Sequence, residues 1–317
     1  MPPLVIQTEN LPQSCSDWIS NHTELHVCPA DSLRFKELLP LAEGLVIRTY
    51  TTVDASMIKT APLLKVIGRA GVGIDNIDLV ACAKNGVRVV HTPDANSESV
   101  VQFVLSKMLA NLRPTSRVKQ QTDQAEWNLL RDAAVCPKQF DEMTLGIIGF
   151  GRIGSRLGKL AAAIGFTVLF HDLKTIETTG PFEQVPLQEL LGRSDVISIH
   201  IDGRTDNTNF CNAELFAIMN KGVLFINSSR GIVVDSHALA NHLRHNPDSS
   251  AVLDVHDPEP ITADYPLLYL PNVELYPHIA CKTNTATVNM GWVVKDVLAV
   301  LQGKTPDFEA ALPKCRT

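Results

Sequence analysis

The chain has 317 residues, which is long enough for two domains that each bury their own hydrophobic core. It contains 28 Lys and Arg against 34 Asp and Glu, a formal net charge of −6, and no block of basic residues stands out. Nucleic acid and anionic membrane surfaces both select clustered positive charge, so we expect neither as the main partner. A small anionic substrate needs only one or two well-placed arginines, and the composition agrees with such a partner.

Cysteine usage and apolar runs predict a soluble protein of a reducing compartment. The seven cysteines are odd in number, widely spaced and form no C-x-x-C pair, so the pattern favours neither a disulfide framework nor a zinc site. The first residues lack the basic and apolar stretches of a signal peptide, and the apolar run at 161–170 is too short for a bilayer. His237, His242 and His245 share one predicted helix, and no carboxylate or Cys pairs with them in the sequence, which favours surface histidines over a metal site. We therefore predict a cytoplasmic protein without a metal.

The N-terminal part of the chain alternates between predicted strands and predicted helices. Amphipathic stretches such as 31–41 and 76–85 separate short runs that are rich in β-branched residues. Such alternation is typical of a parallel sheet with helices on both faces. The predicted strands of this part are residues 4–7, 25–28, 45–48, 65–68 and 87–91.

A second series of strands lies between two long predicted helices. The first helix, over 97–113, has cap candidates at its start and apolar residues at helical spacing. The second, over 285–302, stops before Gly303. Continuous apolarity, as at 223–226, suits strands that are buried on both faces of a parallel sheet. The predicted strands are residues 146–149, 167–171, 196–201, 223–227, 251–255 and 273–276.

A Gly-Phe-Gly-Arg-Ile-Gly segment begins at Gly149, between a predicted strand at 145–148 and a predicted helix at 153–164. Gly149 permits the tight turn, Gly151 lets a pyrophosphate approach the backbone, and Gly154 lets helix and strand pack closely. Free amides at the helix N-terminus then face the phosphates. A glycine-rich turn without a ligand is the alternative, which the strand, the helix and a following acid together disfavour.

The following acid is Asp172, which comes directly after the second strand of this series and 18 residues after the last glycine. A carboxylate at this place accepts hydrogen bonds from the adenosine ribose hydroxyls. It would repel the 2′-phosphate of NADP, so the sequence favours NAD as the cofactor. The nearby Lys174 leaves the strictness of that preference open.

These patterns together predict an α/β protein made of two doubly wound parallel-sheet domains. A Rossmann cofactor domain over residues 98–287 is inserted into a flavodoxin-like substrate domain over residues 1–97 and 288–317. The two long helices set these boundaries, which we expect to be accurate to several residues.

Three polar residues follow three successive strands of the second series, namely Arg230, Glu259 and His278. Ligands of open parallel sheets bind outside the carboxyl ends of the strands, so these side chains are expected at the reacting end of the cofactor. Reduction of a 2-keto acid needs a proton for the carbonyl oxygen and a cation for the carboxylate. Histidine is the natural acid and base at neutral pH, a carboxylate beside it stabilises the imidazolium, and arginine holds a carboxylate with its planar fork.

Each of these residues also has an ordinary structural explanation. Arg230 could form a surface ion pair, Glu259 could sit in a solvated turn, and His278 could cap a strand. Their joint occurrence after three strands of one nucleotide-binding sheet favours a catalytic set.

Two further segments extend the pattern: residues 68–76 read Gly-Arg-Ala-Gly-Val-Gly-Ile-Asp-Asn, and residues 92–97 read Thr-Pro-Asp-Ala-Asn-Ser. With them, the chain resembles the D-isomer-specific 2-hydroxyacid dehydrogenases over almost its whole length. The resemblance implies that Arg230, Glu259 and His278 are catalytic, with the imidazole as acid and base oriented by Glu259. It also implies NAD as cofactor and a homodimer formed through the cofactor domain. The implied substrate-carboxylate site is the amides of Gly71, Val72 and Gly73, and the implied cofactor contacts are Arg152, Ile153, Asp172, Ile201, Ser228, Ser229 and Asp254.

Within the family, residues 45–49 and 68–71 look most like those of 3-phosphoglycerate dehydrogenase, where arginines matching Arg48 and Arg69 line the substrate pocket. Two guanidinium groups can meet the extra charge of a phosphorylated acid. The alternative role for Arg69 is to brace its own loop. Hydroxypyruvate and glyoxylate are alternative substrates, and a non-catalytic NAD(H)-sensing protein, like the corepressors that share this fold, is the alternative from another class. No regulatory domain follows residue 317, so we expect the short type of enzyme.

The chain departs from the family pattern at two places near the expected site. Residues 200–204 read His-Ile-Asp-Gly-Arg in place of the usual His-x-Pro-Leu-Thr, which leaves the contacts of this loop with the cofactor open. His256 stands where an aromatic residue is common. Neither departure removes a catalytic group.

Overall fold

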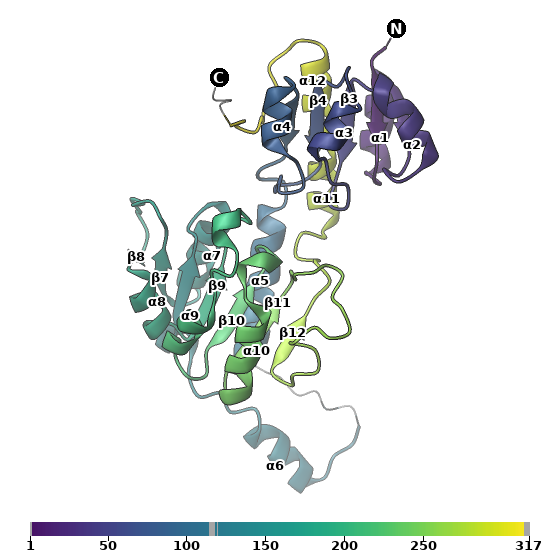
Figure 1. The fold of residues 1–317 in the computed structure, drawn as a ribbon. Helices are drawn as coiled ribbons and strands as arrows, with labels where there is room; N and C mark the ends of the chain where they lie inside the picture. The colour runs from purple at the N-terminus through teal and green to yellow at the C-terminus, as the bar shows by residue number, and fades with distance from the viewer. Residues whose placement is uncertain (1, 114–117, 119, 314–317) are drawn as a thin grey trace. The chain divides into compact units, whose positions relative to one another are not determined.

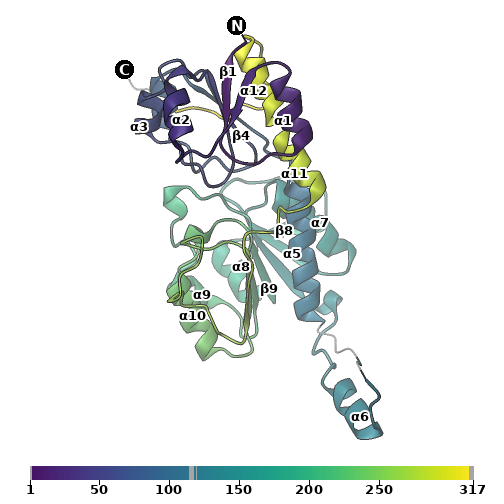
Figure 2. The ribbon, with the colours of Figure 1, turned by 90° about the vertical axis from the view of Figure 1, so that its right-hand side faces the viewer.

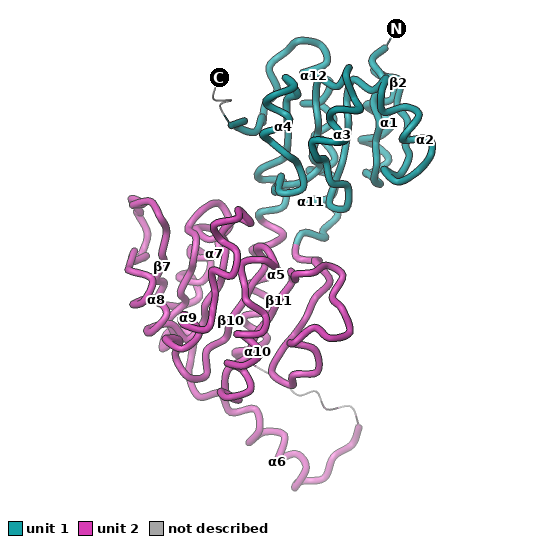
Figure 3. Tube along the Cα trace, in the orientation of Figure 1, with its two compact units in different colours: residues 1–97, 281–317 teal, residues 98–280 magenta. Residues whose placement is uncertain are grey.

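The computed structural model describes residues 2–113, 118 and 120–313 of the chain. The chain divides into two compact units, each with its own sheet, which Figure 3 colours separately. The first unit contains Met1–Ser97 and Cys281–Thr317, and the second contains Glu98–Ala280. Within the described ranges, no helix combines the length and the apolar character needed to cross a membrane.

The second boundary differs from the sequence prediction. We predicted that the cofactor domain extends to residue 287, whereas the units divide between Ala280 and Cys281. The reason is the packing of α11 (Asn284–Gly291) in the first unit, where a Cβ on Gly291 would lie 2.8 Å from Cys15 Sγ. The whole of α11 therefore belongs to the first unit.

The sheet of the first unit has five parallel strands in the order β2-β1-β3-β4-β5. This is the flavodoxin-like order of doubly wound domains. The strands lie within one residue of their predicted positions, because their apolar runs are buried on both faces. They are β1 (Leu4–Gln7), β2 (Glu24–Val27), β3 (Gly44–Ile47), β4 (Val66–Arg69) and β5 (Arg88–His91).

Two helix layers cover this sheet. The helices are α1 (Gln13–Ser20), α2 (Leu33–Leu38), α3 (Ala55–Lys59), α4 (Leu79–Lys84) and α12 (Val293–Leu301). Val46 and Val66 pack with α1 and α12 on one face, whereas Leu45 and Ile67 pack with α2, α3 and α4 on the other. Successive strand residues point to opposite faces, so alternate residues pack in two separate hydrophobic cores. Figure 2 shows α12, from the C-terminal part of the chain, beside α1.

A segment near the C-terminus covers the free edge of β5. Val90 pairs with Glu309 in an antiparallel bridge, and the amide of Ala310 donates to the carbonyl of Val89 at 2.8 Å. Arg88 donates to the Glu309 carboxylate from Nε at 2.7 Å and from Nη2 at 2.6 Å. The segment therefore extends the sheet by a short antiparallel pairing.

The second unit has seven parallel strands in the order β12-β11-β10-β9-β6-β7-β8. Counted from β6, this is the Rossmann order with one strand added at its far edge. The winding reverses between β6 and β9, where ligands of such sheets bind. The strands are β6 (Thr144–Ile148), β7 (Thr167–His171), β8 (Phe182–Gln184), β9 (Val196–Ile199), β10 (Leu224–Asn227), β11 (Ser250–Leu253) and β12 (Val273–Leu275).

Helices also cover both faces of this second sheet (Figure 1). They are α5 (Ser97–Leu112), α7 (Arg152–Ala163), α8 (Leu187–Arg193), α9 (Ala213–Ile218) and α10 (Ser236–His245). A further helix, α6 (Gln124–Asp132), buries no residue and lies away from the sheet in Figure 1. Ile148 shares its core with residues of α8, α9 and α10. Ile147 points to the other face and packs on α7, where a Cβ on Gly158 would lie 3.4 Å from its Cδ1 atom.

Three elements differ from the sequence prediction. The single helix predicted over 285–302 is two helices, α11 and α12, with Trp292 between them at φ −69° and ψ 0°. The edge strand β8 has no predicted counterpart, because Phe182 alone of its three residues is half-buried. The helix α6 has none either, since it buries no residue and Asp123 caps it from within a polar stretch.

Gly68 lies on β4 where α12 packs closely on the sheet, so a side chain at this position should lower the stability of the protein. A Cβ on Gly68 would lie 2.3 Å from Cγ2 of the fully buried Val297. We predict that Gly68→Ala lowers the free energy of unfolding by about 1–3 kcal/mol, because the helix must move away from the sheet. Urea denaturation followed by circular dichroism measures the change. Gly192→Ala, whose Cβ would meet nothing within 4 Å and which lies on α8, should be at least as stable as the wild type, and an equal loss in both variants would contradict the packing argument.

Candidate active site

The glycine motif forms a tight turn between β6 and α7. Gly149 has φ +90°, and a Cβ there would lie 2.7 Å from the His200 carbonyl oxygen, so only glycine fits. A Cβ on Gly154 would lie 2.2 Å from the Gly149 carbonyl oxygen, so the helix packs directly on the turn. Gly151 differs, because its missing side chain would meet nothing within 4 Å. The backbone is thus open at the one glycine that a pyrophosphate should approach.

Polar groups around this turn fit a dinucleotide. Gly151 is the N-cap residue of α7 and has no side chain to satisfy the first amides of this 12-residue helix, which are suited to bind phosphate oxygens. Ser228, after β10, has a buried hydroxyl oxygen that finds no hydrogen-bond partner in the described part of the chain. Ser229 instead bonds Asn227 Oδ1 through its amide at 3.0 Å and its hydroxyl at 2.8 Å. An orphaned buried hydroxyl of this kind calls for a polar ligand.

Asp172 follows β7 and holds the glycine turn. Its Oδ2 accepts the amide of Phe150 at 2.9 Å, and its Oδ1 accepts the amide of Lys174 at 3.0 Å. An ionised carboxylate has roughly four acceptor positions, so both oxygens keep capacity for ribose hydroxyls. The same side chain therefore holds the turn and has acceptor positions that suit ribose hydroxyls.

The loop at 200–204, which departs from the family pattern, lines the turn from the β9 side. Burial lowers the pKa of His200 to about 3, so its ring is neutral. Ile201 packs against the glycine turn. Asp202 has a lowered pKa, mainly because its carboxylate accepts hydrogen bonds from the Arg204 guanidinium. The charges of this loop are thus largely paired with one another.

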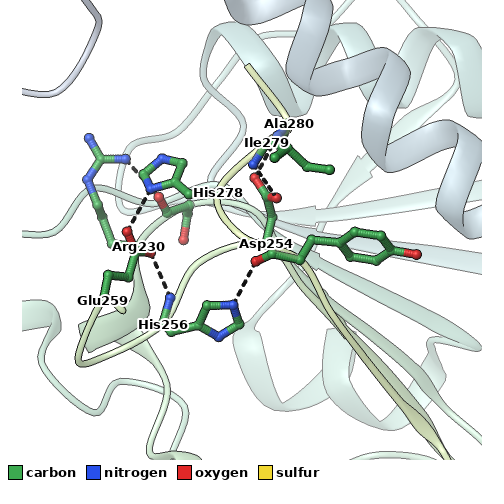
Figure 4. Close-up of polar contacts among 9 residues, drawn as sticks. Arg230, Asp254, His256, Glu259, His278, Ile279 and Ala280 are labelled. Carbon is green, nitrogen blue, oxygen red and sulfur yellow. Dashed lines mark hydrogen bonds and ion pairs between the residues drawn. The ribbon is translucent and has the colours of Figure 1, made fainter. Parts of the chain in front are cut away.

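Arg230 lies in the loop after β10, against two glycines. A Cβ on Gly203 would lie 2.8 Å from Cγ of Arg230, so this glycine gives room to the arginine stem. A Cβ on Gly231 would lie 1.9 Å from the His256 carbonyl oxygen, so Gly231 lets the loops after β10 and β11 touch. The guanidinium donates from Nη1 to the Ser229 carbonyl at 2.7 Å. In Figure 4 the Arg230 side chain lies beside the side chains of Glu259 and His278.

Glu259 and His278 form a hydrogen-bonded pair across the loops after β11 and β12 (Figure 4). Nδ1 of His278 lies 2.9 Å from Oε2 of Glu259, and the side chains are 36% and 31% exposed. Burial raises the pKa of Glu259, but hydrogen bonds from the His278 ring and the His256 amide outweigh it, so the net shift is downward. Since the carboxylate can only accept, Nδ1 carries the proton of this bond. Nε2 is then the ring nitrogen that can exchange a proton with a substrate.

The backbone at His278 has φ +54°, in the left-handed region that side chains other than glycine seldom adopt. Asp254 holds this turn. Its carbonyl accepts the His278 amide at 2.8 Å, and its carboxylate accepts the amides of Ile279 at 2.7 Å and Ala280 at 2.8 Å. Burial raises the pKa of Asp254, and the two amide bonds offset this in part. Asp254, expected as a cofactor contact, thus also fixes the turn that carries the His278 ring.

Sequence reasoning assigned no role to two residues that join these loops. His256, noted as a departure from the family pattern, donates its amide to Glu259 Oε1 at 2.9 Å and places its ring Nε2 2.8 Å from the Tyr276 carbonyl oxygen. Gly231 allows the loops to touch, as described above. The available signal for Gly231 was its place directly after Arg230, and for His256 it was the departure itself.

Part of the expected substrate site lies in the first unit, in the loop after β4. Gly71 has φ +154°, and a Cβ there would lie 1.5 Å from Nη1 of Arg69, so the guanidinium covers this glycine. The Gly71 amide donates to the Arg69 carbonyl at 2.8 Å, and the His91 ring donates from Nδ1 to the Val72 carbonyl at 2.9 Å. The prediction that the Gly71 amide holds a substrate carboxylate thus meets a competing bond, because the tight turn already uses it. Gly73 lies in the same loop.

Arg48 lies at the end of the neighbouring strand β3. Its Nη1 donates to the Asn10 carbonyl at 2.9 Å. Its amide and those of residues 49–51 all donate to the Glu9 carboxylate, at 3.0 to 3.1 Å. Glu9 therefore fixes the loop that presents Arg48 at the carboxyl end of the sheet.

Sequence comparison connects this geometry to characterised proteins. The profile of the D-isomer specific 2-hydroxyacid dehydrogenase, NAD binding domain, matches residues 105–280. The D-3-phosphoglycerate dehydrogenase of Archaeoglobus fulgidus is 34% identical over 270 residues, which are 84% of this chain and 50% of that protein. The hydroxypyruvate reductase of Thermotoga maritima is 34% identical over 286 residues, 89% of this chain and 92% of that protein. The chain thus spans about half the length of the first relative and nearly all of the second.

A solved structure shares the fold of the chain. The D-lactate dehydrogenase of Aquifex aeolicus, crystallised with NAD and lactic acid, aligns with a TM-score of 0.80 and 27% identity over 95% of this chain and 96% of that one. The matched profile covers more than half of the chain and includes the glycine turn and the loops after β10, β11 and β12. The chain belongs to the D-isomer specific 2-hydroxyacid dehydrogenase family of NAD-dependent oxidoreductases.

Proposed function

We propose that this chain reduces a small 2-keto acid to the D-2-hydroxy acid, and catalyses the reverse oxidation, with NAD(H) as the redox cofactor. The observation that carries the proposal is the Glu259–His278 pair, 2.9 Å apart and partly exposed. It follows two neighbouring strands of the nucleotide-binding sheet, at the edge where ligands of such sheets bind. An imidazole stabilised by a carboxylate is suited to proton transfer at neutral pH.

The three catalytic residues have separate roles in this reaction. His278 donates its Nε2 proton to the carbonyl oxygen of the keto acid and takes a proton back in the oxidation. Glu259, ionised because of its lowered pKa, stabilises the imidazolium and orients the ring through Nδ1. Arg230 binds the substrate carboxylate with its guanidinium fork.

The second unit holds NAD in this proposal. The open backbone at Gly151 and the first amides of α7 meet the pyrophosphate, Asp172 meets the adenosine ribose, and the orphaned hydroxyl of Ser228 meets a polar group of the cofactor. When bound, the nicotinamide supplies or accepts the hydride at the substrate α-carbon. The proposed cofactor contacts are Gly149, Gly151, Arg152, Ile153, Gly154, Asp172, Ile201, Ser228, Ser229 and Asp254.

Among the substrates, we favour 3-phosphoglycerate and its keto acid. Arg48 follows β3 and Arg69 ends the paired strand β4, so two arginines stand at the carboxyl ends of neighbouring strands and suit an acid with additional phosphate charge. The Archaeoglobus relative is named for this substrate, whereas the Thermotoga relative, which matches the chain over nearly its whole length, is named a hydroxypyruvate reductase. Because Arg69 also braces Gly71, hydroxypyruvate is the alternative, followed by glyoxylate.

We further propose that two copies pair through the second unit. The helix α6 buries no residue, and its Trp127 and Leu129 are 45% and 70% exposed. Large apolar side chains on a helix without core contacts favour burial against another surface. A second copy brings the same helix and can form a symmetric interface.

A cytoplasmic location agrees with the thiols of the chain. None of the six cysteines in the described ranges is in a disulfide, and four of them are buried. Free thiols persist where the compartment is kept reducing. We therefore propose that the reaction takes place in the cytoplasm.

The reaction is tested by following NADH absorbance with 3-phosphohydroxypyruvate, hydroxypyruvate, glyoxylate and pyruvate. We expect NADH oxidation, with the highest kcat/KM for the phosphorylated acid. Arg48→Leu should then raise KM for the phosphorylated acid more than for hydroxypyruvate, because it removes one cation from the sheet edge. Binding of NADH without oxidation by any of these acids would contradict the proposal and favour the non-catalytic sensor.

A second prediction concerns His278. His278→Ala should lower kcat by about 10²- to 10⁴-fold while the Kd for NADH, measured by fluorescence, stays the same, because the ring moves the proton and does not carry the cofactor. Glu259→Gln keeps an acceptor for Nδ1 without the charge, so its kcat should lie between those of His278→Ala and the wild type. Near-normal turnover of His278→Ala would exclude the proposed acid/base role.

A third prediction concerns Asp172. Asp172→Asn keeps an oxygen acceptor for the amides of the glycine turn but removes the charge that repels a 2′-phosphate. We expect the preference for NADH over NADPH, as the ratio of kcat/KM values, to fall by at least about tenfold. Asp31→Asn, an exposed change in the first unit, is the control and should leave the ratio unchanged. The same ratio in Asp172→Asn and wild type would show that this carboxylate does not discriminate the cofactors.

A further inference from the structure

His256 joins the two loops that carry the acid/base pair. It follows β11, three residues before Glu259, and is 8% exposed. Its backbone amide donates to Glu259 Oε1 at 2.9 Å. Its ring Nε2 lies 2.8 Å from the carbonyl oxygen of Tyr276, two residues before His278. One residue thus contacts both the carboxylate and the strand end that leads to the imidazole.

The partners of the His256 ring fix its tautomer. A carbonyl oxygen can only accept, so Nε2 carries the proton. Nδ1 lies 3.3 Å from the hydroxyl of Tyr265, and burial raises the pKa of this phenol to about 12, so the phenol stays protonated and donates to Nδ1. The two rings also make an edge-to-face contact, with centroids 5.5 Å apart. The imidazole is therefore held through both of its nitrogens.

The Tyr276 carbonyl is shared between His256 and the catalytic loop. It accepts the backbone amide of His278 at 3.0 Å in addition to the His256 ring. The Tyr276 side chain is itself anchored, since its hydroxyl accepts a hydrogen bond from Lys107 Nζ at 2.5 Å. A displacement of this carbonyl would move the left-handed turn at His278 directly.

We propose that His256 is a positioning residue for the reaction, and that its Nε2–H bond to the Tyr276 carbonyl sets the distance between Glu259 and His278. The inference rests on the proposed function, because it takes this pair to be the one that moves the substrate proton. Both His256 nitrogens are occupied by protein partners, so the ring acts through its neighbours. The backbone and the side chain of one residue together hold the carboxylate and the imidazole at bonding distance.

Three variants separate hydrogen bonding from packing. His256→Phe keeps an aromatic ring of similar size but removes the donor. His256→Gln removes the ring but keeps an amide donor that reaches about as far as Nε2. His245→Phe makes the same exchange at an exposed position on α10 and is the matched control.

Steady-state kinetics gives the first readout. We expect His256→Phe to lower kcat by about 10- to 100-fold at an unchanged Kd for NADH, because a misplacement of about 1 Å at a reacting group costs rate in this range. His256→Gln should keep most of the wild-type kcat, and His245→Phe should keep all of it. A wild-type kcat in His256→Phe overturns the proposal, and so does an equal loss in the Phe and Gln variants, which would assign the effect to packing.

A readout that needs no turnover distinguishes failure of this inference from failure of the proposed function. With ¹⁵N-labelled histidine, the Nδ1–H of His278 that binds Glu259 gives a downfield proton resonance, identified by its loss in His278→Ala. We expect this resonance to disappear in His256→Phe and to persist in His256→Gln. If no acid is turned over but the resonances follow this pattern, the proposed function fails while the positioning by His256 stands. If the resonance persists unchanged in His256→Phe, the positioning fails whatever the turnover.

Folding of the Phe variant is checked by circular dichroism and NADH binding. If it does not fold, His256→Asn takes its place with the same expectations. The Asn amide is one methylene shorter than that of Gln and does not reach the Tyr276 carbonyl. A wild-type resonance and kcat in His256→Asn then overturn the proposal.

Discussion

The 2.9 Å hydrogen bond between His278 Nδ1 and Glu259 Oε2 depends on close contact between backbone loops that are far apart in the sequence. Gly231 allows the loop after β10 to touch the carbonyl of His256, and Asp254 holds the left-handed turn at His278 through three backbone amides. Polar bonds to the backbone therefore set the geometry of the pair. Such bonds are directional, so they can fix a catalytic distance between loops.

Several side chains of the site shape their own loop and are also suited to meet a ligand. Asp172 accepts two amides around the glycine turn, and Arg69 covers Gly71 in the first unit. The Asp172 carboxylate keeps acceptor capacity beyond its two amide partners. A loop that is ordered before the ligand arrives loses less conformational entropy on binding, which strengthens the complex. Bracing and ligand recognition, posed as alternatives for Arg69, are thus compatible.

Most of the architecture could be predicted from the sequence, because strands that are buried on both faces leave continuous apolar runs. The strands of the first unit follow from such runs, whereas the glycine turn follows from its own motif and the inserted arrangement from the two long predicted helices. The short strand β8 and the exposed helix α6 bury too few residues to show a recognisable apolar pattern. The break at Trp292 interrupts a pattern that predicts a single helix.

Within the candidate site, Arg230, Glu259 and His278 could be named because each lies in the loop after a strand of the nucleotide-binding sheet. The bond from His256 to the Tyr276 carbonyl could not, since it joins positions 20 residues apart with no sequence spacing of its own. The hydrogen bond from the Gly71 amide to the Arg69 carbonyl could not be predicted from the sequence either, because it depends on the conformation of the local turn.

The pairing of residues near 309 with β5 also has a consequence for the solution behaviour of the chain. Unpaired edge strands recruit strands of other molecules and start aggregates. Here Ala310 donates its amide to the carbonyl of Val89, and Glu309 forms a bridge with Val90. Asp296 on α12 secures the segment by accepting the amide of Asp307 at 2.7 Å. Shortening the chain before this segment, or displacing it with a bulky fusion, would uncover a valine-rich edge and promote self-association.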